Sequence, residues 1–191
     1  MIDLDQLRED IVITTRLCDR DMVFHSTWGL FSPRRVDEGS RLLLRHIKVA
    51  PDETLLDLGC GYGAVGLTLA KLAPRGRAHL VDKDFVAVRY AQKNIELNGL
   101  TNAVAYLSNG FDDVGDVGFT TIVANLPAKV GKELLLLLLH DARSHLAVGG
   151  QLVVVTITGL RQFIKRNFID VFGNYEKLKQ AKHYTVGRAV K

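Results

Sequence analysis

The feature that most constrains the fold of this 191-residue chain is a run of four glycines within ten residues, DLGCGYGAVG, at positions 57–66. TLLDLG at 54–59 predicts a buried strand, and GAVGLTLAKLA at 63–73 predicts a helix that ends near Pro74. Glycine permits tight turns and lets a ligand approach the backbone closely, because it lacks a Cβ. A strand, a glycine loop and a helix in that order are typical of a ligand site at the carboxyl ends of the strands of a doubly wound sheet.

The alternation of apolar runs with helical patterns continues along the chain. We predict strands at 54–59, 78–84, 103–107, 120–124, 151–157, 175–180 and 183–190, and helices at 63–73, 85–99, 132–146 and about 160–171. Buried strands that alternate with helices favour parallel pairing, whereas the last two strands follow each other directly and favour antiparallel pairing. The expected fold class is therefore α/β: a Rossmann-like, doubly wound, mainly parallel seven-stranded sheet with an antiparallel C-terminal edge and helices on both faces.

The first fifty residues have a different pattern. Aromatic and polar residues around Gly29 predict a short hairpin within Met22–Phe31, and a helix is expected to begin at Asp37 or Ser40 and to continue to Val49. A chain of this length is typical of one compact domain. We therefore predict a single domain over 1–191, in which 1–50 pack on the ligand site and 51–191 form the core.

Composition excludes several classes of protein. The longest unbroken apolar run, Leu134–Leu139, is far shorter than the roughly 18 residues that a membrane-spanning helix needs, and the N-terminus carries acids where a signal peptide carries bases. The two cysteines, Cys18 and Cys60, are too few for a disulfide framework, and the six histidines lack metal-ligand spacing. We expect a cytoplasmic protein with no membrane partner and no bound metal; the sequence predicts no oligomeric state.

The positive charge is concentrated near the C-terminus. From Leu160 onward, eight bases stand against two acids: Arg161, Lys165, Arg166, Lys177, Lys179, Lys182, Arg188 and Lys191 against Asp170 and Glu176. A basic segment on a nearly neutral body attracts a polyanion, and Arg34 and Arg35 add two further bases that can grip phosphates. RNA is the partner that this pattern predicts. The alternative is a set of solvated faces that keep the protein soluble.

The glycine loop by itself is compatible with two kinds of nucleotide cofactor. Gly61-x-Gly63-x-x-Gly66 also matches the dinucleotide fingerprint, and Asp82 lies at about the right distance to bind a ribose in either case. Asp57 separates the two, because a dinucleotide site usually has an apolar residue before the first glycine. A carboxylate there can meet the ammonium of a methionine moiety. The alternative is that Asp57 caps the amides of the loop.

A second discriminating motif is Asn125-Leu126-Pro127, at the end of the strand predicted at 120–124. An exocyclic base nitrogen is a poor nucleophile because its lone pair is delocalised into the ring. The side-chain carbonyl of Asn125 and the main-chain carbonyl of Leu126 can accept its two hydrogens, and Pro127 would stiffen the loop. This arrangement aims the lone pair at a sulfonium methyl. The alternative is an ordinary turn that ends the strand.

The order of these motifs resembles the small-domain RNA methyltransferases, specifically the ribosomal RNA guanine-N2 methyltransferases and their stand-alone archaeal-type relatives. The resemblance covers almost the whole chain and rests on four segments: GLFSPRRVDEGSRLLL at 29–44, DLGCGYGAVG at 57–66, NLPAKVGKELL at 125–135 and GNYEKLKQAKHYTVGRAVK at 173–191. The first is the most specific, and a dinucleotide enzyme is not expected to share it. The resemblance implies a class I methyltransferase that transfers a methyl from S-adenosyl-L-methionine, with S-adenosyl-L-homocysteine as product, to a guanine-N2-like nitrogen in ribosomal or other structured RNA.

The resemblance also implies which residues form the site. The catalytic motif would be Asn125, Leu126 and Pro127. The cofactor-binding residues would be Asp57, Gly59, Cys60, Gly61 and Gly63 at the methionine part, Asp82 and Lys83 at the ribose, Asn109 and Gly110 at the adenine, and Asn125, Phe31 and Asp37 near the pocket.

Two positions depart from the family pattern. Position 109 is usually aspartate, and Asn109 keeps the hydrogen-bond acceptor without the charge. The catalytic motif is usually Asn-Pro-Pro followed by a ring that stacks on the base, whereas here Ala128 follows Pro127. Asn-Leu-Pro also resembles the transfer-RNA guanine-N1 methyltransferases. One of the rings of Phe24, Trp28 or Phe31 could replace the stacking residue, although packing in the core is the alternative for each.

Three alternative functions remain open on the sequence. The chain can be a catalytically degenerate RNA-binding protein of the same fold, because Asn109 and Ala128 depart from the pattern. It can be a methyltransferase that acts on a protein or a small molecule. It can also be a dinucleotide oxidoreductase, which would bind NAD in preference to S-adenosylmethionine.

Overall fold

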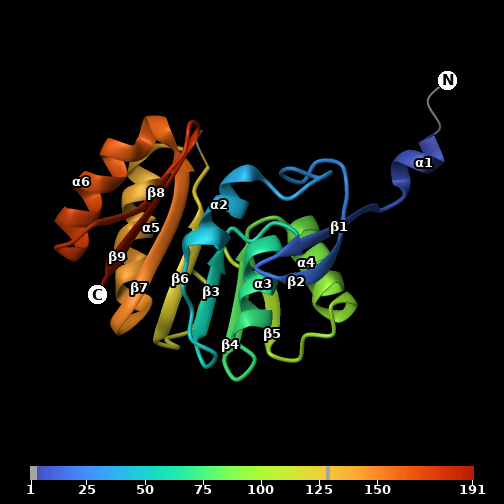
Figure 1. Ribbon diagram of the computed structural model, residues 1–191, viewed down its shortest axis with the longest axis horizontal. Coiled ribbons are helices and arrows are strands. Elements are labelled where there is room, and N and C mark those ends of the chain that lie inside the picture. Colours follow the sequence, from blue (N-terminus) through green and yellow to red (C-terminus); the bar gives the residue numbers. More distant parts are fainter. Residues whose placement is uncertain (1–3, 128–129) are drawn as a thin grey trace.

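The computed structural model describes residues 4–127 and 130–191 and shows one seven-stranded sheet with an attached two-stranded hairpin (Figure 1). The large sheet has the order β5-β4-β3-β6-β7-β9-β8. Its strands are β3 (Thr54–Leu58), β4 (Arg77–Asp82), β5 (Ala103–Leu107), β6 (Phe119–Asn125), β7 (Leu146–Ile157), β8 (Glu176–Gln180) and β9 (Tyr184–Val190). The pairs among β3–β7 are parallel, and β9 pairs antiparallel with both β7 and β8. The predicted sheet, including its antiparallel C-terminal edge, is confirmed.

Helices cover both faces of the sheet. One face carries α2 (Glu38–His46), α3 (Ala64–Leu72) and α4 (Phe85–Leu97), whose apolar side chains share a core with Leu55, Val123 and Val153. The other face carries α5 (Lys132–His145) and α6 (Arg161–Phe172), which pack on side chains such as Ile122 and Val154. Neighbouring strand residues point to opposite faces, so the central strands carry apolar side chains on both faces, as Leu55 and Leu56 of β3 do.

Two element boundaries differ from the prediction by three residues or more. The helix that follows Asp37 ends at His46, three residues before Val49. β7 begins at Leu146, directly after α5, and runs through Gly149 and Gly150, whereas the sequence predicted a strand from Gln151. A register shift against β6 accommodates the added segment. The additional elements are a short helix, α1 (Leu4–Arg8), and a 3-10 turn, η1 (Thr158–Leu160).

The predicted hairpin within Met22–Phe31 is wrong in its position. The hairpin joins β1 (Ile11–Leu17) to β2 (Arg20–Ser26), and the chain turns at Cys18 and Asp19, with φ values of 47° and 58°. A two-residue turn of this hand matches the twist of the strands but usually contains Gly or Asn, and neither signals it here. Gly29, with φ 95°, lies instead in the loop after β2.

Two asparagines near the end of α4 (Phe85–Leu97) hold the hairpin against the rest of the fold: the buried Asn94 and the half-buried Asn98 that follows the helix. The Asn94 side chain is fully buried; it accepts from His25 N at 2.7 Å and donates to His25 O at 2.9 Å and to Tyr62 O at 2.8 Å. Asn98 binds Val23 N and Val23 O in the same way. The two side chains thus bind Val23 and His25 on the edge of β2 that no described strand pairs, and Asn94 connects that edge to the glycine loop at Tyr62.

Within the described parts of the chain, none of the helices has the length and apolar character required to cross a membrane.

We predict that Asn94→Ala lowers the free energy of unfolding by about 2–4 kcal/mol, because three backbone groups, His25 N, His25 O and Tyr62 O, lose their partner at about 1 kcal/mol or more each. Chemical denaturation followed by circular dichroism measures the change. Glu96→Ala, on the exposed side of the same helix, is the control and should stay within about 0.5 kcal/mol of the parent. Equal effects of the two substitutions would contradict the assigned role of Asn94.

Candidate active site

The residues predicted for the site meet where the sheet changes direction. β3 lies between β4 and β6, and the helices that follow these strands leave the sheet on different faces. In the strand register Asp57 lies between Leu80 and Val123, so Asp82 and Asn125 extend just beyond it on the two neighbours. Such a switch point at the carboxyl edge is where doubly wound sheets bind ligands. The fold therefore brings Asp57, Asp82 and Asn125 together from distant parts of the sequence.

The glycine loop has a backbone that side chains would disfavour. Gly59, Gly61 and Gly63 have φ values of 73°, 55° and 93°. No heavy atom outside the neighbouring residues lies within 4 Å of where a Cβ would stand at Gly59 or Gly61, so the space above the loop is open. At Gly66 a Cβ would lie 2.7 Å from Leu80 Cγ, which explains why α3 can pack closely on the sheet.

Asp57 lies beneath this loop and is buried, with 4% of its surface exposed. Its Oδ2 accepts from Gly66 N at 2.6 Å, so the carboxylate caps the first turn of α3, as the alternative interpretation of the sequence held. Burial raises the pKa of Asp57 to about 7; the nearby charge of Asp82 adds to the rise, and the Gly66 hydrogen bond opposes it. A buried carboxylate with one donor has unused acceptor capacity for a cation.

Asp82 ends β4 and fixes the other side of the loop. Its Oδ2 accepts from Gly61 N at 2.9 Å, and its Oδ1 accepts from Asp84 N at 3.0 Å. Ser108 N donates to Asp82 O at 3.0 Å, which places Asn109 beside this strand end. Asn109 is exposed, and its amide donates to Asp112 Oδ2 at 3.2 Å. The structure thus groups the predicted ribose and adenine positions along one stretch of the edge.

The remaining predicted cofactor positions surround the same loop. Cys60 is buried, and burial raises the pKa of its thiol well above the ordinary value, so the thiol stays protonated. Gly110, with φ 64°, follows Asn109, and Lys83 is exposed after Asp82. Phe31 lies in the loop between β2 and α2 with 68% of its surface exposed. Contact of these residues with a cofactor stays a prediction.

Asn125 is held by the start of α2. Its Nδ2 donates to Asp37 Oδ2 at 3.0 Å and to Ser40 Oγ at 3.1 Å. A carboxylate without a proton only accepts hydrogen bonds, so the amide nitrogen must face Asp37 and the amide oxygen Oδ1 must face away from it. The network therefore fixes which end of the Asn125 amide is presented to a ligand.

Asp37 is itself fixed by three further donors. Its Oδ2 accepts from Gly39 N and Ser40 N at the beginning of α2, and Tyr184 Oη donates to its Oδ1 at 3.2 Å. The pKa of Tyr184 is raised, first by burial and then by the charge of Asp37 and this hydrogen bond. The sequence indicated Asp37 as a helix cap but gave no signal for the role of Tyr184, which comes from β9.

The loop between β2 and α2 crosses the site and is tied to it. Tyr62 Oη, from the glycine loop, donates to Arg35 O at 3.2 Å. Arg34 lies over the ring of Trp28, 4.6 Å from its centroid, and the ring is 41% exposed. Phe24 is fully buried in the core and is therefore no stacking residue. Trp28, Arg34 and Arg35 form an exposed rim beside the candidate site.

The other two residues of the Asn-Leu-Pro motif differ in exposure. The Leu126 side chain is buried, and Leu126 N donates to Val155 O at 2.9 Å; Pro127 is exposed. Ala128, where the family has a ring, lies outside the described residues.

The basic C-terminal segment is less available than its composition predicted. Arg188 pairs with Glu176 at 2.6 Å, and Lys191 Nζ donates to Ser144 O and Leu146 O at the end of α5. Arg161 donates to Gln180. These three bases serve the fold, and the exposed remainder lies on α6, on β8 and in the β8–β9 turn.

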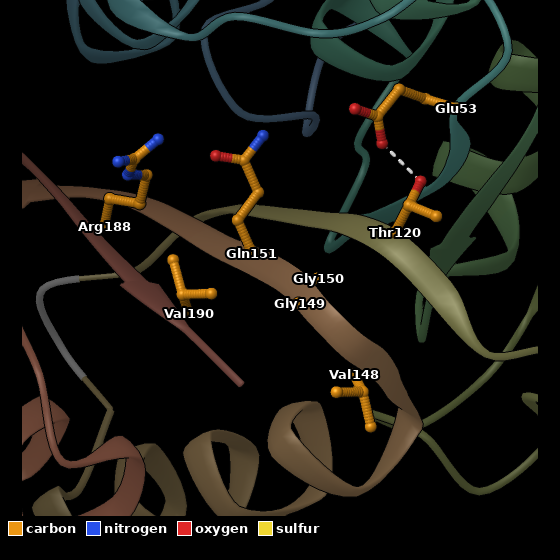
Figure 2. A pocket seen from close by; sticks show the side chains of 8 residues that line it. All are labelled: Glu53, Thr120, Val148, Gly149, Gly150, Gln151, Arg188 and Val190. Carbon is orange, nitrogen blue, oxygen red and sulfur yellow. Dashed lines mark hydrogen bonds between the residues drawn. The ribbon is translucent and has the colours of Figure 1, made fainter.

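A cavity of about 320 Å³ at the opposite edge is not part of this site. It lies between Glu53, Thr120, Gln151 and Arg188, at the amino ends of the central strands (Figure 2). The Glu53 carboxylate is occupied by Ala50 N and by the hydroxyls of Thr120 and Thr121. Glu53, just before β3, therefore connects the beginning of β3 to the beginning of β6.

Comparisons with known proteins show the family and the fold of this chain. The family model of the methyltransferase small domain matches residues 21–188. An uncharacterized protein, YbxB of Bacillus subtilis (strain 168), is 37% identical over 142 residues, which are 73% of this chain and 71% of that protein. Ribosomal RNA small subunit methyltransferase C of Pseudomonas syringae pv. syringae (strain B728a) is 34% identical over 164 residues, 84% of this chain and 48% of the relative.

A solved structure has the same fold. The 16S rRNA N2 methyltransferase of T. thermophilus, in complex with AdoMet and guanosine, is 30% identical with a TM-score of 0.85 over 94% of this chain and 50% of that one. The chain thus spans about half the length of the relatives that are named as ribosomal RNA methyltransferases. Since the family model covers most of the chain and the sheet has the same Rossmann-like arrangement, this chain belongs to the methyltransferase small-domain family.

Proposed function

We propose that this protein is an S-adenosylmethionine-dependent methyltransferase that acts on a nucleobase nitrogen, guanine-N2-like, in ribosomal or other structured RNA. The observation that carries the proposal is the orientation of Asn125, whose amide oxygen is directed away from Asp37 at the switch point beside the glycine loop. Residues 1–191 act as one domain in this proposal, with 1–50 lying against the cofactor site. We further propose that the protein acts in the cytoplasm.

The residues present fit S-adenosylmethionine. The open space above Gly59 and Gly61 lets a ligand approach the backbone, and Asp57 can accept the ammonium of the methionine part. Asp82 retains lone pairs for the vicinal ribose hydroxyls, while Asn109 can accept from the adenine amine. A dinucleotide has no ammonium group that a buried carboxylate at position 57 could accept.

Asn125 and Leu126 would activate the substrate amine. Asn125 Oδ1 accepts one hydrogen and the main-chain carbonyl of Leu126 accepts the other, which pushes the nitrogen toward tetrahedral geometry. When bound, S-adenosylmethionine supplies an activated methyl on its sulfonium. The work left to the protein is to align the amine, and alignment alone contributes several kcal/mol in well-oriented reactions, of order 7–11 kcal/mol at most.

RNA is supported as the substrate class by the relatives and by the rim. The named relatives act on ribosomal RNA according to their names, and the T. thermophilus structure contains guanosine. Arg34 and Arg35 are exposed and make no ion pair among the described residues, so both can meet phosphates. The exposed ring of Trp28 adds a surface on which a base can stack.

Asn125→Ala is predicted to lower kcat by at least about 100-fold while the Kd for S-adenosylmethionine stays within about twofold, because Asn125 only borders the cofactor pocket, whereas its amide orients the amine. Transfer of labelled methyl to RNA, protein and small-molecule fractions, followed by nucleoside analysis, measures kcat and identifies the product. Normal turnover by the variant would refute the mechanism. Label in protein or small molecules would reassign the substrate, and RNA binding without any transfer would indicate a degenerate RNA-binding protein.

Tyr184→Phe is predicted to lower kcat about three- to tenfold with little change in KM, because Asp37 loses a donor and holds the Asn125 amide less firmly. The matched control is Tyr175→Phe, whose ring packs on Phe168 at the other face of the sheet. Equal kcat values for the two variants would show that Tyr184 does not position Asn125.

The affinity for S-adenosylmethionine is predicted to rise with pH up to about 7. Because burial raises the pKa of Asp57 in the free protein to about 7, the carboxylate must lose a proton to receive the ammonium. Kd should therefore fall by about tenfold per pH unit between roughly pH 5.5 and 6.5, as calorimetry can measure. Asp57→Asn keeps an acceptor for Gly66 N, binds more weakly and shows a flat profile.

The control for that series is Asp52→Asn, in the exposed turn before β3, which should reproduce the parent profile. If the Kd of Asp57→Asn depends on pH as the Kd of the parent does, a group other than Asp57 causes the pH dependence. Tighter binding of NAD than of S-adenosylmethionine in the same calorimeter would overturn the cofactor.

A further inference from the structure

A groove of about 410 Å³ lies between α2 and the turn that joins β8 to β9. Arg41 and Arg45 line it from the helix, and Lys182 and His183 line it from the turn. Tyr184 lines it too, and this tyrosine donates to Asp37, which holds Asn125. The groove is therefore two hydrogen bonds away from the residue proposed to position the substrate amine.

The groove is strongly positive. Glu38 is its single acidic lining residue. Within residues 4–127 and 130–191, neither Arg45 nor Lys182 pairs with a carboxylate. Arg41 is held by uncharged partners, Thr15 Oγ1 at 2.9 Å and Val36 O at 3.3 Å, and it too forms no ion pair with a described carboxylate. A concave surface with several unpaired bases concentrates anions.

His46, next to Arg45 at the end of α2, lies close to the same positive charges. This residue ends α2, and its pKa is lowered, first by burial and then by the charges of Lys179 and Arg45. Lys179 lies on β8, so the field extends from the groove along the neighbouring strand.

We propose that this groove binds phosphates of the RNA strand that carries the target base and so guides that base to Asn125. The inference rests on the proposed function and adds the path of the strand. Phosphate contacts of this kind set position and register without reading sequence. Of the basic C-terminal segment, the part that contacts RNA is then the β8–β9 turn with its Lys182.

The chain supplies a matched control on its other face. Lys165 and Arg166 are exposed on α6, which packs on the side of the sheet opposite α2. The pair has the same charge as Arg45 and Lys182 and lies in the same basic stretch of sequence as Lys182. A general effect of net charge would therefore appear in both pairs, whereas a groove effect appears in only one.

The experiment compares Arg45→Gln/Lys182→Gln with Lys165→Gln/Arg166→Gln in binding to protein-free ribosomal RNA over a range of salt concentrations. The groove variant should flatten the slope of log K against log salt by about 1.4–1.8, since each phosphate contact contributes about 0.7–0.9. The α6 variant should leave the slope unchanged. The Kd for S-adenosylmethionine and the circular dichroism spectrum of both variants should match the parent, and Lys182→Glu alone should weaken RNA binding more than Lys182→Gln.

The outcomes separate this inference from the proposed function. Equal slopes for the two double variants, or no RNA binding by the parent, would overturn the groove. Methyl transfer to RNA by the parent together with equal slopes would overturn the groove alone. A parent that binds RNA through the groove but transfers no methyl would refute the proposed activity and leave the groove in place.

Discussion

The hydrogen bond between Asn125 Nδ2 and Asp37 Oδ2 connects the two parts of this protein that have to cooperate. Asp37 caps α2 in the N-terminal segment, and Asn125 ends a central strand of the sheet. The same carboxylate accepts from the helix amides and from Tyr184, so one group terminates a helix, secures a strand end and orients an amide. If this contact were absent, the N-terminal segment would still be attached through Asn94, but the Asn125 amide could turn over.

The glycine loop depends on a comparable arrangement of carboxylates. Asp57 accepts from one end of the loop and Asp82 from its middle, while Asn94 binds its carbonyl at Tyr62. These contacts hold the loop open without any side chain above Gly59 and Gly61. Rigid support beneath the loop and free space above it are what a nucleotide-type ligand requires. The raised pKa of Asp57 reflects the cost of burying a carboxylate at this position.

The positive charge of the C-terminal segment is only partly available at the surface. The C-terminal segment is basic by composition, yet several of its bases are bound by the fold, and the exposed ones face different directions. The β8–β9 turn adds its charge to that of α2, because β9 lies next to β7 and contacts that helix, and Lys179 of β8 adds charge near the end of the helix. Tyr184 lines this groove and also donates to Asp37, so the groove is connected to the candidate site.

The sequence by itself determined the sheet, its antiparallel edge and the strand ends at which the candidate site lies. Alternating apolar runs, a glycine loop and strand-end polar residues are local signals, and local signals survive in a single sequence. The same reasoning misplaced the hairpin, because Cys18 and Asp19 make its turn without the residues that usually mark one. It also left open whether Asp57 caps the loop.

Only the tertiary structure decided which groups act together. The bonds from Asn125 to Asp37 and from Asp37 to Tyr184 span 88 and 147 residues of sequence, and no pattern within either segment encodes them. The pairing of α2 with the β8–β9 turn into one basic groove has the same origin. Strand order sets these contacts, because the sheet places β6, β7 and β9 side by side whatever their separation along the chain.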